Sequence, residues 1–370
     1  MPVERIGIFG GTFNPIHSGH VGVALKAAAE HGLDKVLVVP AARNPFKHGC
    51  GEDALRWTLV KYACAPHPAL EPCDIELRRG GASYSIDTVR AIHERHPEAS
   101  LFFIVGEDNI ADVSRWKDAD ELARLVTFIS YARTPESSTE VRRRLGAGEP
   151  VSDLVPEAVA DFLEAKGVVF DFGGVISLSP VGVGGELRTY CETLGLSRAA
   201  FDDGWRKFRA MWDGGECSFE ELYRRMFANA GLPPPTPEQV GRLWQLDAEG
   251  WVKTLSPETL ALMKDLKAAG KKIGILSNMS EDFYERLFAP RCAEYRALAD
   301  AEVISGFERC VKPGREIYDI AAARLGLAPH DLLFLDDTES NVTGARKWGW
   351  RSRVYHAAPP PVLATGEENW

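Results

Sequence analysis

The sequence has few cysteines, and they form no recognisable pattern. There are seven in 370 residues, and no two are separated by the two residues typical of a redox or zinc-binding pair. A disulfide framework and a zinc site of that type are therefore not indicated. A reducing cytoplasm is the simplest setting for such a chain, and we predict a cytoplasmic localisation.

Clustered positive charge and long apolar runs are also missing. The formal net charge is -10, from 43 basic and 53 acidic residues, and no cluster of Lys and Arg indicates a surface for nucleic acid. Neither a signal peptide nor a run of 18 apolar residues is recognisable, so we expect no membrane insertion. Small-molecule substrates are the expected partners, and homo-oligomerisation is left open.

What the sequence does contain is a segment rich in glycine and histidine, directly after an apolar stretch at 5–9. The segment 10–20 reads Gly-Gly-Thr-Phe-Asn-Pro-Ile-His-Ser-Gly-His and includes His17 and His20. Glycines let the backbone approach an anion, and paired histidines at the start of the next helix can stabilise charge that develops on phosphates. The pattern predicts a strand, a turn and a helix that handle phosphate.

A second candidate for anion binding lies at 137–142. Ser137 precedes Glu140 by three residues, which is the spacing of a capping box, so we expect a helix to begin there. The positive end of a helix dipole attracts anions, and Arg142, one turn in, can add a bidentate contact to a phosphate. An ordinary capped surface helix would show the same spacing. The presence of the histidine segment in the same chain favours the anion-binding interpretation.

Residues 5 to 165 resemble the nucleotidyltransferases with a His-x-Gly-His signature, and among them the bacterial nicotinate mononucleotide adenylyltransferases. Further matching segments are Val39-Pro40, Asn44 to Lys47, Arg56, Ile75 to Gly80, Ser83 to Thr88, Phe102 to Asp108, Trp116 and Ser137 to Arg142. The resemblance implies adenylyl transfer from ATP, the substrate, to nicotinate mononucleotide, giving deamido-NAD and pyrophosphate in NAD biosynthesis.

The resemblance also implies the roles of single residues. His17 and His20 are the catalytic pair at the ATP phosphates, while Asp108 approaches the ribose and Trp116 stacks on the pyridine ring. A Mg²⁺ ion shares the charge of the triphosphate with two basic residues, Lys47 and Arg142. The other predicted substrate-binding residues are Gly10, Thr12, Phe13, Arg56, Ser83, Tyr84, Thr88, Gly106, Ser138 and Thr139.

Two departures from this family pattern stand out. Three residues connect Arg133 to Ser137, where relatives usually have a longer connection, often with an additional strand. Lys117 replaces the aromatic residue that some relatives place after the stacking tryptophan. Nicotinate is still favoured over nicotinamide, and Trp116 together with 83–88 argues against a different acceptor such as pantetheine phosphate.

The length predicts two or three domains. A helical segment from Glu157 to Ala165 closes the first domain in the manner of the family, and a new apolar strand begins at Gly167. We predict domains at 1–165 and 167–358, followed by a loose tail at 359–370.

The second domain carries four ordered motifs. The strand Gly167 to Phe170 delivers Asp171 at its carboxyl end, where ligands bind in open α/β sheets. Downstream follow Ile273 to Asn278, Lys312-Pro313 and Leu332 to Asp337. Together they resemble the haloacid dehalogenase superfamily. The two resemblances imply an α/β fold with two Rossmann-like parallel-sheet domains, the second with a helical cap inserted at about 185–255.

This resemblance implies a Mg²⁺-dependent phosphatase. Asp171 is the nucleophile that forms an aspartyl-phosphate. The implied metal ligands, all hard oxygens that suit Mg²⁺, are Asp171, the Gly173 carbonyl, Asp336 and Asp337. The implied phosphate-binding residues are Ser277, Asn278 and Lys312. Most phosphatases of the superfamily have a second aspartate where this chain has Gly173, although a subgroup with Asp-Phe-Gly-Gly openings looks similar.

The leading hypothesis is therefore a bifunctional enzyme, an adenylyltransferase joined to a phosphatase for a small phosphate ester. One alternative keeps the transferase but makes the second domain a non-catalytic regulatory or dimerising module. Another keeps the transferase chemistry with a different phosphorylated acceptor.

Overall fold

The computed structural model describes residues 3–43, 52–178 and 183–357. The chain divides between Glu164 and Ala165 into two compact units, called unit 1 and unit 2 below. The predicted phosphate-binding Lys47 and the predicted tail at 359–370 lie outside the described residues.

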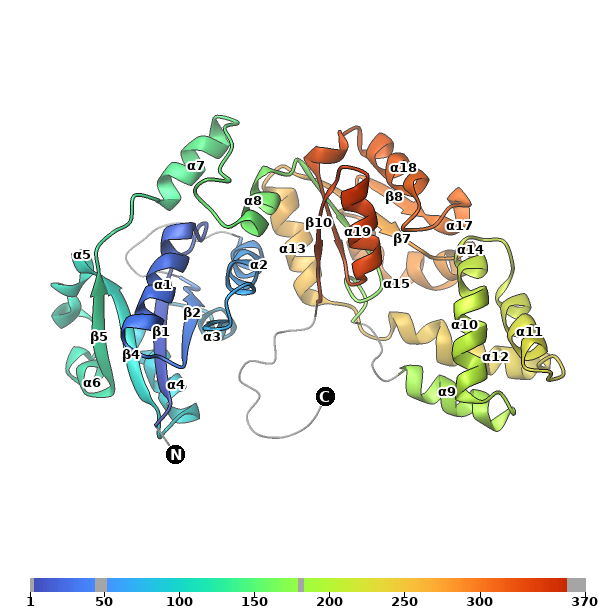
Figure 1. Ribbon diagram of the computed structural model, residues 1–370, viewed down its shortest axis with the longest axis horizontal. Helices are drawn as coiled ribbons and strands as arrows, with labels where there is room; N and C mark the ends of the chain where they lie inside the picture. The colour runs from blue at the N-terminus through green and yellow to red at the C-terminus, as the bar shows by residue number, and fades with distance from the viewer. Residues whose placement is uncertain (1–2, 44–51, 179–182, 358–370) are drawn as a thin grey trace. The chain divides into compact units, whose positions relative to one another are not determined.

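Unit 1 is built on a five-stranded parallel sheet in the order β3-β2-β1-β4-β5 (Figure 1). The strands are β1 (Arg5–Gly11), β2 (Lys35–Pro40), β3 (Leu70–Pro72), β4 (Ser100–Gly106) and β5 (Val126–Tyr131). The helices are α1 (Ser18–Glu30), α2 (Asp53–Cys64), α3 (Ile75–Arg79), α4 (Ser85–Arg95), α5 (Glu107–Ile110), α6 (Ala119–Leu125), α7 (Ser138–Gly146) and α8 (Glu157–Glu164). Parallel strands covered on both faces read as continuous apolar runs, as 36–40 does.

The core of unit 1 places its functional loops. Ile8 of β1 and Phe103 of β4 pack in one apolar cluster with Ile86 and Ile92 of α4. The chain continues from β1 to β2 and β3 on one side of β1, and then crosses to β4 on its other side. The crevice beyond the carboxyl end of β1, where the strand order reverses, is the preferred ligand position of such sheets. The histidine segment follows β1 and therefore enters this crevice.

Unit 2 is also built on a five-stranded parallel sheet, in the order β10-β9-β6-β7-β8 (Figure 1). The strands are β6 (Gly167–Phe170), β7 (Lys272–Ser277), β8 (Ala301–Ile304), β9 (Leu332–Asp336) and β10 (Arg351–Val354). Helices that accompany the sheet are α13 (Pro257–Ala268), α14 (Glu281–Phe283), α15 (Ala289–Arg291), α16 (Ala293–Arg296), α17 (Ser305–Glu308), α18 (Arg315–Leu325) and α19 (Glu339–Lys347). The fold class predicted from the sequence is confirmed.

Four helices are inserted between β6 and β7. They are α9 (Val183–Thr193), α10 (Arg198–Asp213), α11 (Phe219–Asn229) and α12 (Pro237–Asp247). Helices α10, α11 and α12 meet in an aromatic cluster in which the Phe219 ring centroid lies 5.2 Å from that of Trp212 and 5.0 Å from that of Trp244. Aromatic packing therefore holds the insert together, and we call these four helices the cap.

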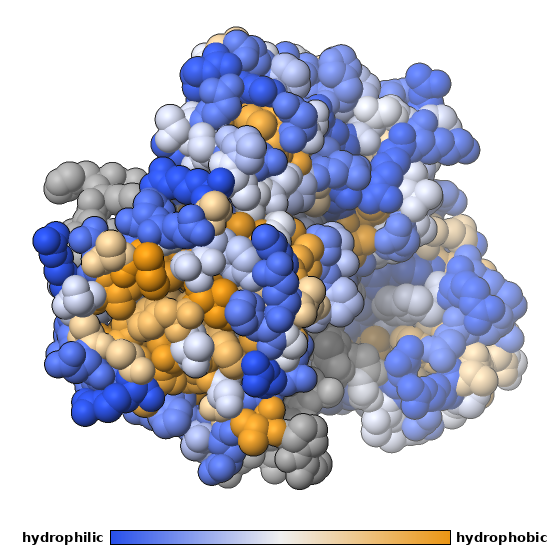
Figure 2. Space-filling view, turned by 60° about the vertical axis from the view of Figure 1, so that its left-hand side comes forward, coloured by the Kyte–Doolittle hydropathy of each residue, from blue (hydrophilic) through white to orange (hydrophobic). Residues whose placement is uncertain are grey.

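The face drawn in Figure 2 is largely hydrophilic outside one patch. The side of unit 1 that faces the viewer in Figure 2 carries a patch of apolar side chains bordered by hydrophilic residues. None of the described helices combines the length and the apolarity that crossing a membrane requires.

Candidate active sites

The two histidines of the first motif lie on top of each other at the start of α1. Their ring centroids are 3.6 Å apart, with an interplanar angle of 28°. The backbone N–H of His17 donates to Nδ1 of His20 over 3.2 Å. Since Nδ1 of His20 accepts this bond, a neutral His20 carries its proton on Nε2. The loop thus sets the tautomer of His20 as a donor through Nε2.

His17 is buried, with 5% of its surface exposed. Burial lowers the pKa of His17 to about 4, although the carboxylate of Glu136 acts in the opposite direction. Its Nδ1 atom has no hydrogen-bond partner among the described residues. A buried unpaired polar atom is costly, so a ligand oxygen that pairs with it would stabilise the site.

Helix α7 begins where the sequence predicts and is attached to the histidine loop. Ser137 is the N-cap residue, and its hydroxyl accepts the backbone N–H of Glu140 over 3.1 Å. The Ser138 hydroxyl donates to the carbonyl of Pro15 over 2.9 Å. Nη1 of Arg142 donates to the carbonyl of Asn14 over 2.5 Å. The two predicted anion-binding motifs, more than a hundred residues apart in sequence, are therefore brought together.

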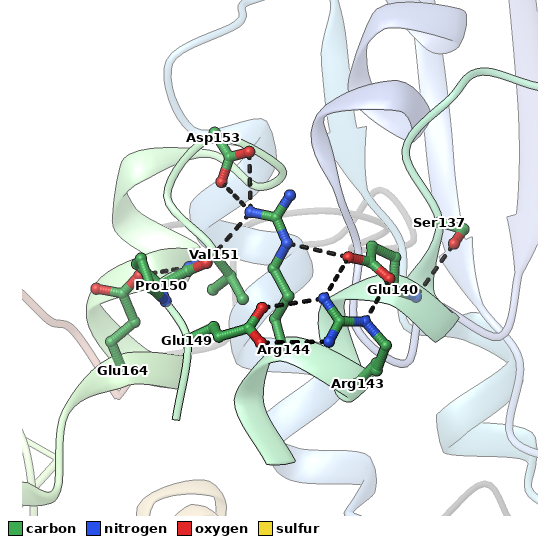
Figure 3. Close-up of polar contacts among 9 residues, drawn as sticks. All are labelled: Ser137, Glu140, Arg143, Arg144, Glu149, Pro150, Val151, Asp153 and Glu164. Carbon is green, nitrogen blue, oxygen red and sulfur yellow. Dashed lines mark hydrogen bonds and ion pairs between the residues drawn. The ribbon is translucent and has the colours of Figure 1, made fainter. Parts of the chain in front are cut away.

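An ion-pair network fixes the other side of α7 (Figure 3). The Glu140 carboxylate binds Arg143 at 2.8 Å and Arg144 at 3.1 Å, and these bonds lower its pKa to about 2. Arg144 continues to Asp153 at 2.7 Å, and Arg143 to Glu149 at 3.0 Å. The network ties α7 to the segment that precedes α8, so Arg142 is held toward the histidine loop.

A cleft of about 1090 Å³ opens at the carboxyl ends of β1 and β4. Fourteen of the predicted site residues of unit 1 line it, from loops and helices that follow several different strands. They are Gly10, Thr12, Phe13, His17, His20, Ser83, Tyr84, Thr88, Gly106, Asp108, Trp116, Ser138, Thr139 and Arg142. A cleft of this size can hold a drug-sized ligand or larger.

Arg56 lies outside the lining of this cleft. It is 2% exposed, and its guanidinium donates to the carbonyls of Thr12 at 2.6 Å and Ala41 at 2.7 Å, and to Asp53 at 2.6 Å. These bonds hold the ends of β1 and β2 in place. The predicted contact between Arg56 and a substrate stays a prediction, and the observed contacts indicate that it positions Thr12.

One end of the cleft is aromatic and carries a cation. The Trp116 ring stands edge-on to Phe103, with centroids 5.9 Å apart. Nζ of Lys117 lies 4.9 Å from the centroid of the Tyr84 ring and 3.0 Å from a carboxylate oxygen of Asp87. An aromatic slot beside a positive charge suits a flat, anionic ring.

The cleft is also lined by two residues that were not among the predicted site residues, although one of them, Glu76, lies in the matching segment 75–80. Glu76, buried in α3, accepts the Thr88 hydroxyl over 2.6 Å, and burial raises its pKa. Nε of Arg133 donates to Asp108 over 3.0 Å, so the predicted ribose ligand is paired with an arginine. Neither contact follows a sequence periodicity, because each joins separate elements of the fold.

In unit 2, one lysine joins the predicted nucleophile to the predicted metal ligands. Nζ of Lys312 lies 2.8 Å from Oδ1 of Asp171 and 2.6 Å from Oδ2 of Asp336, and it donates to the carbonyl of Leu276 over 3.1 Å. Lys312 and Asp336 have side chains 1% and 0% exposed. The three charged groups therefore meet in a nearly water-free site.

The electrostatics of this group follow from burial and pairing. Burial raises the pKa of Asp171, and the charge of Lys312 opposes that change. Burial disfavours the charge of Lys312 as well, but Asp171 and Asp336 outweigh it and raise the pKa of the lysine. Lys312 therefore stays positive and can neutralise an arriving phosphate.

The predicted metal ligands also come together. Oxygen atoms of Asp171, Asp336 and Asp337 lie within 4.8 Å of one another, and the hard carboxylate oxygens fit Mg²⁺. Oδ1 of Asp336 is oriented by the backbone N–H of Thr338 over 2.8 Å. Gly174 has φ +65°, and a Cβ there would lie 2.3 Å from Asp337, so both backbone and space require glycine.

The predicted phosphate-binding residues Ser277, Asn278 and Lys312 are called the phosphate cradle below, and hydrogen bonds link Asn278 to Lys312. Asn278 donates through Nδ2 to the carbonyl of Lys312 over 3.1 Å and accepts the Lys312 backbone N–H over 2.8 Å. These bonds place the loop after β7 beside Lys312. Ser277 ends β7 and is 3% exposed. The amide of Asn278 thus orients the cradle, and its predicted contact with phosphate remains a prediction.

Comparison with known proteins divides the chain in the same way. The cytidylyltransferase-like family matches residues 8–158, and the haloacid dehalogenase-like hydrolase family matches residues 165–349. A Herpetosiphon aurantiacus protein named "Probable nicotinate-nucleotide adenylyltransferase" is 36% identical over 190 residues, which cover 44% of this chain and 96% of the relative. A Thermus thermophilus protein of the same name is 38% identical over 183 residues, covering 44% and 98%.

Among solved structures, unit 2 is similar to a haloacid dehalogenase family enzyme from Bacteroides thetaiotaomicron in a magnesium complex. The identity is 17%, the TM-score is 0.43, and the match covers 54% of this chain and 97% of that one.

Proposed function

Because the chain belongs to the cytidylyltransferase-like family in its first part and to the haloacid dehalogenase-like hydrolases in its second, we propose that it is a bifunctional enzyme. Unit 1 transfers the adenylyl group of ATP to nicotinate mononucleotide, and unit 2 hydrolyses a small phosphate ester. The observation that carries the first activity is the meeting of the histidine pair and Arg142 at one cleft.

The reaction in unit 1 is an in-line displacement at the α-phosphorus of ATP. An oxygen of the acceptor's phosphate forms the new P–O bond, the bond to the β-phosphate breaks, and pyrophosphate leaves with the electron pair. No covalent intermediate on the protein is required, so catalysis rests on position and charge. Mg²⁺ bound to the ATP phosphates would reduce their negative charge.

His20 donates a hydrogen bond through Nε2 to the reacting phosphate, and Arg142 adds a permanent charge from the start of α7. His17 is neutral in the free protein. Phosphate oxygens nearby favour its protonated form, so ligand binding supplies part of the positive charge that the transition state needs. The site thus gains charge when the polyanion arrives.

The acceptor end of the cleft favours nicotinate. Trp116 and Tyr84, which both line the cleft, contact the pyridine ring, and Lys117 beside Tyr84 supplies a cation whose charge Asp87 partly offsets. A carboxylate on the ring gains from that charge, whereas an amide gains less.

The deciding experiment measures pyrophosphate release from ATP with nicotinate mononucleotide, nicotinamide mononucleotide and pantetheine phosphate, each at several concentrations. We expect the highest kcat/KM with nicotinate mononucleotide. A preference for pantetheine phosphate would refute the acceptor assignment while leaving the adenylyl transfer intact.

In unit 2, an oxygen of Asp171 attacks the phosphorus of the ester, the bond to the leaving oxygen breaks, and an aspartyl-phosphate forms. Asp171, Asp336 and Asp337 would hold Mg²⁺, which lets two anions approach each other. Lys312 neutralises the transferring group, with Ser277 beside it. Water then hydrolyses the acyl phosphate and regenerates Asp171.

The non-catalytic alternative for unit 2 is tested by phosphate release from a panel of pyridine mononucleotides and sugar phosphates. We expect release by the wild-type chain and none by Asp171→Asn. The absence of release from every ester by the wild-type chain would favour a regulatory or dimerising module.

A further inference from the structure

The proposed phosphatase needs a proton donor that residue 173 does not supply. An ester oxygen leaves most easily as an alcohol, and glycine at 173 has no acid to protonate it. The position is also covered, since a Cβ on Gly173 would lie 3.2 Å from a ring carbon of Trp251. The donor therefore has to come from another element of unit 2.

The end of helix α10 in the cap reaches the phosphate cradle. The hydroxyl of Ser305 donates to the backbone carbonyl of Asp213 over 2.5 Å, and the same oxygen accepts the N–H of Met279 over 2.8 Å. Met279 follows the Ser277-Asn278 pair directly. A Cβ on Gly214 would lie 3.5 Å from Val311, the neighbour of Lys312. Asp213 is thus anchored between the two loops that frame the cradle.

The carboxylate of Asp213 belongs to a buried polar cluster in the cap. Nε of Arg209 donates to Asp213 over 2.9 Å, and Nη1 contacts Asp247 at 3.4 Å. Asp247 also accepts the hydroxyl of Tyr223 over 3.1 Å. The Asp247 side chain is 2% exposed, whereas that of Asp213 is 14% exposed. Of the two carboxylates in the cluster, Asp213 is therefore the one that water or a substrate can reach.

We propose that Asp213 is the general acid and base of unit 2, in place of the acid that residue 173 lacks; this inference rests on the proposed phosphatase function. In the first step the protonated carboxyl gives its proton to the ester oxygen as the P–O bond breaks and Asp171 becomes phosphorylated. In the second step the carboxylate takes a proton from the water that attacks the aspartyl-phosphate. Inorganic phosphate leaves, and both aspartates return to their starting forms.

The charges around Asp213 suit this exchange. Burial raises the pKa of Asp213 to about 6, with Arg209 and Lys312 acting against the rise and Asp247 adding to it. Two carboxylates face one guanidinium in the cluster, so it carries an excess negative charge when all three are ionised. A phosphate ester that binds beside it favours the protonated form of the more exposed carboxyl.

Two aryl phosphates of similar size separate this role from a structural one. 4-Nitrophenyl phosphate has a leaving oxygen that needs little protonation, whereas phenyl phosphate has a more basic one. In the full chain with Mg²⁺, we expect Asp213→Asn to lower kcat/KM for phenyl phosphate by roughly a hundredfold or more and that for 4-nitrophenyl phosphate by less than about tenfold. Loss of the base should also give a burst of one nitrophenolate per enzyme, followed by slow turnover.

Two further variants serve as controls. Asp202→Asn removes a carboxylate from the same helix, where Asp202 binds Arg188 at 2.9 Å on the surface. This variant should leave kcat/KM for both substrates unchanged. Asp213→Glu keeps the acid and should restore part of the phenyl phosphate activity, even if Asp213→Asn lowers the stability of the cap.

Equal effects of Asp213→Asn on the two substrates, or no effect on either, would overturn the role of Asp213 while leaving the phosphatase standing. A wild-type chain inactive on both esters would instead contradict the proposed phosphatase, and this inference with it.

Discussion

The candidate phosphate sites of the two units both lie at the carboxyl ends of parallel strands, but their charged groups are arranged differently. Unit 1 presents a neutral, buried His17 and keeps Arg142 at the edge of an open cleft. Unit 2 encloses Lys312 between two carboxylates that water barely reaches. We expect the first site to become more positive when a polyanion binds, because His17 then gains a proton, whereas Lys312 in the second site carries its charge before any ligand enters. A large, highly charged substrate suits the first arrangement, and a single phosphoryl group suits the second.

The largest expected effect comes from breaking the enclosed ion group of unit 2. Lys312→Met leaves Asp171 and Asp336 buried without their cation, which should cost about 3 kcal/mol or more in the free energy of unfolding of unit 2. Denaturant unfolding of the full chain measures this change. Lys166→Met is the matched control, because that lysine is 67% exposed in its pair with Asp331 and should cost less than about 1 kcal/mol. Equal losses of unfolding free energy in the two variants would show that the buried ion group contributes no more to stability than an exposed pair.

The neutral state of His17 should be visible as a pH dependence. The pKa of His17 in the folded chain is about 4, below the ordinary histidine value of 6.5, so the unfolded chain binds the proton first. The contribution to stability is complete above pH 6.5 and is lost as the pH falls toward 4. Its size is on the order of 3 kcal/mol at most, from the difference between the two pKa values.

NMR titration of labelled histidines, with His17→Gln to assign the signal, measures this pKa directly. A non-hydrolysable ATP analogue should raise it, because phosphate oxygens stabilise the imidazolium. A pKa of His17 near 6.5 in the free protein, or a pKa that does not change when the analogue binds, would contradict the proposed difference between the two units.

Substitution of Arg142, which carries the permanent charge at the cleft, should change the free energy of unfolding little and the rate of adenylyl transfer more. Arg142→Ala removes a guanidinium that contacts the histidine loop and lines the cleft, and we expect kcat/KM for adenylyl transfer to fall by about ten- to a hundredfold. Arg142→Lys should recover part of the loss. A variant with normal pyrophosphate release would mean that α7 does not contribute to the phosphate site.

The smallest expected effect lies in the network behind α7 (Figure 3). Arg144 is 25% exposed in its pair with Asp153, so Arg144→Ala should cost about 1 kcal/mol or less in stability. Adenylyl transfer should fall only a few-fold, since α7 keeps its contact between Ser138 and Pro15. A loss as large as that of Arg142→Ala would show that the network, and not the cap at Ser137, positions the helix.

Sequence reasoning located the parts of the candidate sites that are short segments at strand ends. The segment with His17 and His20 and the helix start at Ser137 could be recognised locally, and parallel topology brings such ends to one edge of a sheet. The carboxylates after β6 and β9 follow the same rule.

The contacts that sequence reasoning missed join elements with no shared pattern. Arg56 was predicted to contact substrate, and the sequence did not indicate that its guanidinium binds the carbonyls of Thr12 and Ala41. Asp213 ends a cap helix, and nothing nearby in the sequence indicates that its backbone carbonyl accepts the Ser305 hydroxyl. Such roles depend on how the insert packs, which tertiary contacts decide.

The most direct test assays both reactions in two variants of the full chain. His20→Ala should lower adenylyl transfer by roughly a hundred- to a thousandfold and leave phosphate release unchanged. Asp171→Asn should abolish phosphate release and leave pyrophosphate release from ATP unchanged. Loss of both activities in either variant, or phosphate release that survives Asp171→Asn, would contradict the account of two separate phosphate-handling sites.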